Sequence, residues 1–204
     1  MKNLNLKFVA FLATILITST LNVRDSFAQK FTDGDIDFNM GLGIFRTFAI
    51  GSEYNIGIPP ISISADYCFM EDIGIGNIGL GGFIGFSTAK EEHSFTYANQ
   101  VLYEYGWKNT ALIIGAKGTY HFNINLPDNI DLYGSVILYY MFVSDKYYED
   151  GDYSGSSNNV NPFGSRPGGS LVAGVKYYFI DDLAAFVEVG YSISIFTFGV
   201  TLKI

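Results

Sequence analysis

The sequence predicts an all-β protein, an eight-stranded antiparallel transmembrane β-barrel with up-and-down meander topology. Three observations lead to this prediction. Apolar residues alternate with small or polar residues in eight separate segments, the connections between these segments are alternately short and long, and an apolar leader precedes all of them. Strict alternation is the two-residue period of a β-strand.

The beginning of the chain has the pattern of a secretory signal peptide. Two lysines come first, residues 8–21 form an uncharged apolar run, and residues 26–28 (Ser-Phe-Ala) place small residues at a cleavage site. The run is short for a membrane-spanning helix, which needs about 20 residues. We expect residues 1–28 to be removed and residues 29–204 to form one exported barrel domain. An uncleaved anchor is the alternative, because two charged residues lie close to the cut.

The composition excludes several classes of function. The leader removes three of the 12 basic and one of the 20 acidic residues, which leaves 9 and 19 and a net charge of −10. Such a chain lacks the clustered Lys and Arg that bind nucleic-acid phosphates. Its single cysteine, Cys68, excludes an intrachain disulfide. After the leader no apolar stretch is long enough for a membrane helix, so a membrane-spanning mature chain must cross as strands.

Each alternating segment has an uncharged apolar face and a second face of small or polar residues. The segments are residues 36–44, 61–69, 78–86, 112–122, 132–142, 171–179, 185–191 and 196–204. In a soluble barrel or sandwich, the alternative architecture, the apolar face would be the core and the second face would be charged. Because the second face carries only a few charges, we expect the apolar face to contact lipid and the second face to line a narrow interior.

A small set of charged or titratable residues falls on the inward face. These residues are Asp66, Lys117, His121, Lys176, Glu188 and Lys203. Isolated charges inside a barrel would be costly, so we expect ion pairs drawn from Lys117, Lys176, Asp66 and Glu188. An eight-stranded barrel is only wide enough for its side chains to fill it. The sequence therefore predicts a plugged lumen, and a narrow channel for small or apolar solutes is the alternative.

Aromatic residues mark the two edges of the lipid-facing band. Three segments end in Tyr-x-Phe directly before a turn, and the periplasmic girdle that this predicts comprises Tyr67, Phe69, Tyr120, Phe122, Tyr177 and Phe179. The second girdle, at the opposite edge, would comprise Phe86, Trp107, Tyr140, Phe142, Tyr191 and Phe196. Ordinary core packing of these aromatics is the alternative.

The remaining connections are predicted to be long extracellular loops, residues 46–60, 89–106 and 144–169. Short turns on one side and long loops on the other are the outer-membrane arrangement. Tyrosines among Ser, Gly and Asn are also typical of recognition surfaces. The possible contact residues are Tyr103, Tyr105, Trp107, Tyr147, Tyr148 and Tyr153. Alternatively, these tyrosines extend the strands or pack against lipid headgroups.

The hairpin repeat, residues 176–182 (KYYFIDD) and residues 186–191 (FVEVGY) carry a resemblance to a known group. The chain resembles the small outer-membrane β-barrel domain family, which is related to the OmpA, OmpX and OmpW barrels. The resemblance implies an eight-stranded barrel with no catalytic residues. It also implies contact with outer-membrane lipid, lipopolysaccharide and the outer-membrane assembly machinery. Such barrels often end in an aromatic residue, whereas this chain ends in Ile204.

No motif predicts an enzyme, a metal site or a cofactor. The lipid face has no Ser, His, Asp or Glu, although a lipid-modifying site on a loop, built from His93, Ser94 and Glu91 or Glu92, is a remote alternative. We therefore expect a non-enzymatic outer-membrane protein whose barrel anchors long loops in a structural or surface-interaction role. The chemistry of an extracellular partner is not encoded in any motif.

Overall fold

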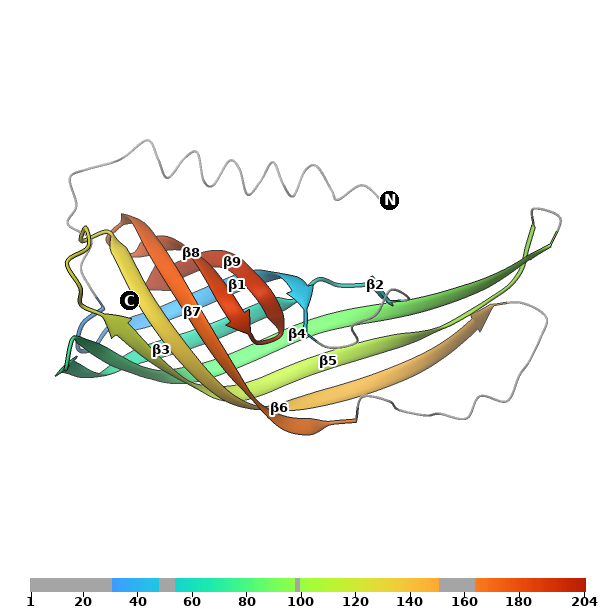
Figure 1. Ribbon diagram of the computed structural model, residues 1–204, viewed down its shortest axis with the longest axis horizontal. Coiled ribbons are helices and arrows are strands. Elements are labelled where there is room, and N and C mark those ends of the chain that lie inside the picture. Colours follow the sequence, from blue (N-terminus) through green and yellow to red (C-terminus); the bar gives the residue numbers. More distant parts are fainter. Residues whose placement is uncertain (1–30, 48–53, 98–99, 151–163) are drawn as a thin grey trace.

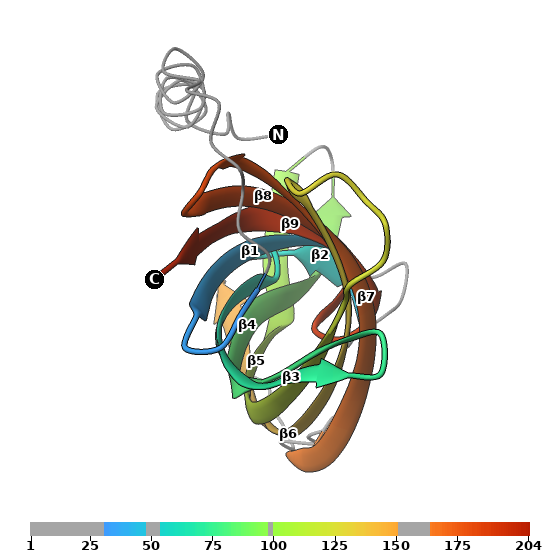
Figure 2. The same ribbon diagram turned by 90° about the vertical axis from the view of Figure 1, so that its left-hand side faces the viewer.

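In the computed structural model, which describes residues 31–47, 54–97, 100–150 and 164–204, eight strands close into a barrel (Figures 1 and 2). They are β1 (Ile36–Arg46), β3 (Ile61–Ile73), β4 (Gly76–Tyr97), β5 (Gln100–Phe122), β6 (Ile130–Asp150), β7 (Arg166–Ile180), β8 (Leu183–Tyr191) and β9 (Ser194–Lys203). A ninth, short strand, β2 (Tyr54–Ile56), pairs with β4 outside the ring. The expected leader lies outside the described residues. No helix among those described is long and apolar enough to cross a membrane.

All strand pairs of the ring are antiparallel, and they follow chain order. The order is β4-β3-β1-β9-β8-β7-β6-β5, and β5 pairs again with β4. The pairing of β1 with β9, in which Phe38 lies opposite Leu202, joins the first strand to the last. Closure leaves the ring without a free edge, as a hydrocarbon environment requires. The predicted eight-stranded meander is confirmed.

Side chains alternate between a buried inner face and an exposed apolar outer face. On β6, Ile137 is 2% exposed and its neighbour Leu138 is 67% exposed; on β7, Val172 is 5% exposed and Leu171 is 70% exposed. Every strand of the ring places apolar side chains on this outer face. Water-soluble monomers rarely expose contiguous apolar surface of this extent. The outer face is therefore the lipid-facing surface of a transmembrane barrel, as predicted.

The height of the apolar band fits a bilayer. On β5 the outward row from Phe122 to Leu112 covers ten residue steps. This is about 34 Å along a strand, or about 26 Å in height at a tilt of about 40°. Outer-membrane barrels have an apolar band of about 25 Å.

The predicted loop at residues 89–106 is wrong, because β4 and β5 continue through it as a paired hairpin that ends at Tyr97 and Gln100. Above the apolar band both faces of the hairpin lack a lipid environment, so the alternation of residue types ends although the backbone ladder continues. The predicted loop at residues 144–169 is shorter than expected, since β6 continues to Asp150 and β7 begins at Arg166. The predicted loop at residues 46–60 contains β2.

Three strands consequently project beyond the rest of the barrel (Figure 1). Pairing between β6 and β7 ends at Met141 and Arg166, whereas pairing between β5 and β6 continues to Glu104 and Asp150. We call the parts of β4, β5 and β6 beyond the apolar band the projecting sheet.

Candidate functional site

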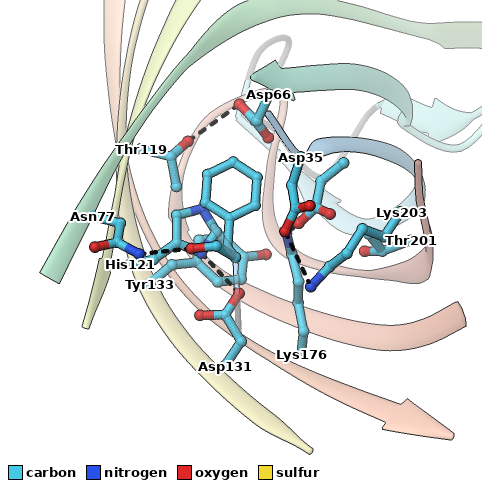
Figure 3. A network of polar contacts seen from close by, with 12 residues as sticks. Asp35, Asp66, Asn77, Thr119, His121, Asp131, Tyr133, Lys176, Thr201 and Lys203 are labelled. Atoms are coloured by element: carbon cyan, nitrogen blue, oxygen red, sulfur yellow. Dashed lines mark hydrogen bonds and ion pairs between the residues drawn. The ribbon is translucent and has the colours of Figure 1, made fainter. Parts of the chain in front are cut away.

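The candidate site is a polar network inside the barrel (Figure 3). It lies in the half nearer to the short turns, since His121 is one residue from the end of β5 and Lys203 is the last residue of β9. All six residues that the sequence places on the inward face lie inside. Asp66, Lys117, His121, Lys176 and Lys203 are buried, and Glu188 is half-buried. Their partners come from strands that are far apart in the sequence.

Asp66 on β3 is the acceptor at the centre of one half of the network. Its carboxylate accepts hydrogen bonds from Lys117 Nζ at 2.9 Å, from Asn39 Nδ2 at 3.0 Å and from Thr119 Oγ1 at 3.2 Å. Thr201 Oγ1 in turn donates to Asn39 Oδ1 at 2.7 Å. These contacts connect β1, β3, β5 and β9 across the interior. Among them, the carboxylate of Asp66 and the ammonium of Lys117 form an ion pair that is almost completely buried.

Lys176 on β7 forms the second buried ion pair, with Asp37 on β1. Tyr178 also donates to Asp37, at 3.3 Å, and the Lys176 ammonium lies 4.9 Å from the centre of the Tyr133 ring. Glu188 accepts instead from the Tyr133 hydroxyl at 2.9 Å. Lys176 therefore pairs with Asp37 and not with Glu188, although both Lys176 and Glu188 belong to the set from which ion pairs were expected. Asp37 was absent from the predicted set. It alternates with the outward-facing apolar residues of its segment, and this inward position is the signal that could have identified it.

The segment before β1 closes the network on the short-turn side. The Phe31 ring stacks on His121 with a centroid distance of 4.1 Å, and Asn77 Nδ2 donates to the Phe31 carbonyl at 2.6 Å. A side chain at Gly79 would meet the Phe31 ring at 3.1 Å, so glycine provides the space for it. His121 Nδ1 is 2.7 Å from Asp131 Oδ2. No sequence pattern indicated that Phe31 would enter the barrel.

Two further contacts hold Lys203 near the same end. Its ammonium lies 4.5 Å from the centre of the Tyr178 ring and 3.8 Å from Asp35 Oδ2. Tyr133 fills the adjacent space above Gly174, where a Cβ atom would meet the ring at 2.4 Å. Cations, carboxylates and aromatic rings thus pack against one another at this level of the barrel.

Above the polar network an apolar layer shares the interior with buried polar side chains such as Ser87, Asn109 and Ser170. The buried residues of this layer are Phe83, Ala89, Ala111, Ile113, Ile137, Met141 and Ile193, and Tyr139 and Val143 pack against them. The alternation of residue types did not separate these residues from the polar inward face. Among the described residues, no group of three or more His, Cys, Asp or Glu is placed to hold a metal ion.

The six aromatics of the expected periplasmic girdle face outward near the short turns. Tyr67, Phe69 and Tyr177 are exposed, whereas Tyr120, Phe122 and Phe179 are half-buried. Tyr120 contacts Phe122 edge-on at 5.0 Å, and Tyr177 contacts Phe179 at 5.4 Å. Trp107 does not belong to the second girdle, because it lies on the inner face of β5 together with the buried Asn109. Lys108, between these two residues, is on the outer face.

The other predicted contact residues fall at the edge of what the structure describes. Tyr103 and Tyr105 lie on β5, and Tyr147 and Tyr148 lie on β6, but their side chains are outside the described part, and so is all of Tyr153. His93, Ser94, Glu91 and Glu92, the residues of the remote enzymatic alternative, lie on β4, and their side chains are not described either.

No family model and no curated protein matches the chain. Several solved structures are similar to it. The N-terminal β-barrel domain of OprF from Pseudomonas aeruginosa is 13% identical, with a TM-score of 0.46 over 84% of this chain and 98% of that domain. The outer membrane protein OprG from Pseudomonas aeruginosa is 11% identical, with a TM-score of 0.43 over 88% of this chain and 99% of that one.

Ail, the attachment invasion locus protein of Yersinia pestis, is also similar. In its complex with the heparin analogue sucrose octasulfate it is 11% identical, with a TM-score of 0.42 over 85% of this chain and 100% of that one. The sequence likewise resembles small outer-membrane barrels. At these values the likeness is one of general architecture, and no property of the three proteins is carried over to this chain.

The ion pairs lead to a prediction about coupling. Removing one partner of a buried pair leaves an uncompensated charge and costs about 3–5 kcal/mol. K176A and D37A should therefore be strongly non-additive in the free energy of unfolding. K176A and E188A should couple more weakly than K176A and D37A, because no ion pair joins Lys176 and Glu188 and they share only the Tyr133 side chain. Urea unfolding in lipid vesicles, followed by the gel mobility of unboiled samples, measures both cycles. Coupling to Glu188 in place of Asp37 would contradict the assignment.

Proposed function

We propose that this chain is a non-enzymatic integral protein of the bacterial outer membrane, whose plugged barrel anchors a projecting sheet as a contact surface for partners outside the cell. The observation that carries the proposal is the projecting sheet. β4 and β5 continue past the last apolar row to a hairpin at Tyr97 and Gln100, about 35 Å along the strand from Phe86. This is much longer than a connection needed only to join two strands.

Two features support the outer membrane as the location. The sequence after residue 28 has no apolar stretch long enough for a membrane-spanning helix, and the strands form a closed antiparallel ring with an apolar outer face. Barrels of this kind belong to outer membranes. The signal-peptide pattern of residues 1–28 supplies the export route that such a location requires. Short turns on one side and the projecting sheet on the other then orient the sheet toward the outside of the cell.

The packing of the interior supports an anchor rather than a channel. The Asp66–Lys117 and Asp37–Lys176 pairs cross the polar half, Phe31 covers its end, and an apolar layer that includes Ile113 packs in the other half together with buried polar side chains. Eight strands leave room for little more than these side chains.

We therefore expect no steady ion conductance from the protein in planar bilayers. A continuous path for hydrated ions would need the buried pairs to separate, which leaves uncompensated charges in the interior. Single-channel recording of the folded protein checks this, with boiled protein and detergent alone as controls. Stable unitary current steps that appear only with folded protein would favour the channel for small solutes instead.

The edges of the projecting sheet offer a means of recognition. Within the described residues, no strand pairs with β4 beyond Glu91 on the side of β2, or with β6 beyond Met141 on the side of β7. Strand edges with free amide and carbonyl groups are templates for the addition of a further strand. Rigid scaffolds also commonly present binding residues on the segments that extend from them.

Shortening the hairpin tests this function. In the variant, Asn-Gly replaces residues 94–104 and joins the paired residues His93 and Tyr105 as a two-residue turn. We expect it to insert and to keep the heat-dependent gel mobility of the parent, because the ring is untouched. Cells that display it should lose the adhesion to protein- or polysaccharide-coated surfaces, or to one another, that the parent confers.

The control is a variant changed at the opposite end of the barrel, with Asn-Gly in place of Asp181 and Asp182 in a short turn. That variant should retain adhesion. If the shortened hairpin left adhesion intact, or if it abolished folding, the projecting sheet would be structural and the proposed function would be wrong.

A further inference from the structure

The outer face changes its chemistry at the same level on three adjacent strands. Reading upward on β4, β5 and β6, the paired residues are first Phe86, Leu112 and Phe142, then Thr88, Thr110 and Ser144, and then Lys90, Lys108 and Lys146. An apolar level is thus followed by a hydroxyl level, in which Thr88 is covered by the segment at Ile58, and then by three lysines in register. We call these three lysines the lysine row. The succession marks the edge of the lipid-facing band.

The lysine row lies on the outer face. Ala89 and Asn109, which precede or follow two of the lysines in the chain, are buried at 0% and 2% exposure and point inward. Lys90 and Lys108 are half-exposed, and Lys146 is exposed. Because side chains alternate along a strand, all three ammonium groups are on the side that faces the membrane and its headgroups.

The location of the other cations makes the row distinctive. Among the described residues, Lys117, Lys176 and Lys203 are inside the barrel and Arg46 is buried. Arg166 is exposed, but it lies on the same face of β7 as Gly168, which makes room for the interior ring of Tyr139. Arg166 is therefore on the inner face. In a chain with a formal net charge of −8, the outward-facing cations of the described part are therefore gathered in one row.

This arrangement is unfavourable without an anion. Residues directly opposite on antiparallel strands have Cβ atoms about 5 Å apart, and like charges at such positions destabilise the sheet. In the described part of the chain, no carboxylate contacts any of the three lysines. An anionic group that bridges two or three of them would convert the repulsion into attraction.

We propose that Lys90, Lys108 and Lys146 bind the phosphate groups of anionic lipid headgroups in the leaflet that surrounds the projecting sheet. The inference rests on the membrane location in the proposed function, and it names a lipid ligand for the barrel. Lysine stems lie along apolar surface while their ammonium groups reach the headgroups, and lysine is a common phosphate ligand. A lipid is the ligand, rather than a distant macromolecule, because the row lies two levels above Phe86 and not at the tip of the sheet.

The test measures binding of a fluorescent diphosphorylated lipid A to the folded, detergent-solubilised protein. A surface lysine near anionic headgroups contributes about 1 kcal/mol, so K108Q should weaken binding about fivefold and K90Q/K108Q/K146Q roughly a hundredfold. R166Q removes one exposed positive charge away from the row and should bind like the parent. Dephosphorylated lipid A should bind the parent as weakly as the phosphorylated lipid binds the triple variant.

Stability in bilayers gives an independent readout with opposite signs. In phosphatidylcholine vesicles, K108Q should need as much urea to unfold as the parent or more, because repulsion within the row is relieved. In vesicles that also contain diphosphorylated lipid A, K108Q should unfold at lower urea than the parent. If the triple variant fails to fold, K108Q and R166Q still make this comparison.

The proposal is overturned if the triple variant binds like the parent, if R166Q weakens binding as much as K108Q, or if millimolar inorganic phosphate displaces the lipid, since the row would then be a site for free anions. The hairpin variant that lacks residues 94–104 keeps all three lysines and should bind lipid A like the parent. Failure of the partner-binding function is therefore distinguishable from failure of this lipid site.

Discussion

The architecture depends on the requirement that backbone amides in hydrocarbon find partners within the protein. Water is absent there, so an unpaired amide or carbonyl costs several kcal/mol, and a sheet can cross only if it closes. In this chain the pairing of β1 with β9 and of β4 with β5 completes the ring. Closure fixes one face of every strand toward lipid and the other toward a narrow interior, and the distribution of residue types follows from that division.

The inner face shows what such a narrow interior permits. Charged side chains are tolerated because they meet partners of opposite sign from distant strands, as Lys176 meets Asp37 and Lys117 meets Asp66. Glycines at positions 79 and 174 leave room for the rings of Phe31 and Tyr133. Polar and apolar layers therefore fill the barrel in succession, and the lipid band, the hydroxyl level and the lysine row follow one another on the outside.

The sequence predicted what alternation encodes and missed what it does not encode. Residues such as Ile137 and Leu138 reveal their faces because lipid and interior demand different side chains. Residues 89–106 were predicted as a loop because the alternation of residue types ends above the membrane. The backbone hydrogen bonds between the strands, which do not require particular residue types, continue there. The partner of Lys176 was missed because alternation gives a face and not a partner, and Asp37 lies 139 residues away. The lysine row appears only when the register of three strands is known.

The central claim, that the apolar face contacts lipid and the interior is closed, is tested most directly by NMR of methyl-labelled protein in nanodiscs with a spin label on the lipid acyl chains. Three adjacent pairs provide internal controls. We expect strong broadening at Ile114, Leu138 and Leu171, which face outward, and little at their buried neighbours Ile113, Ile137 and Val172. Equal broadening within each pair, or stronger broadening of the buried members, would contradict the account.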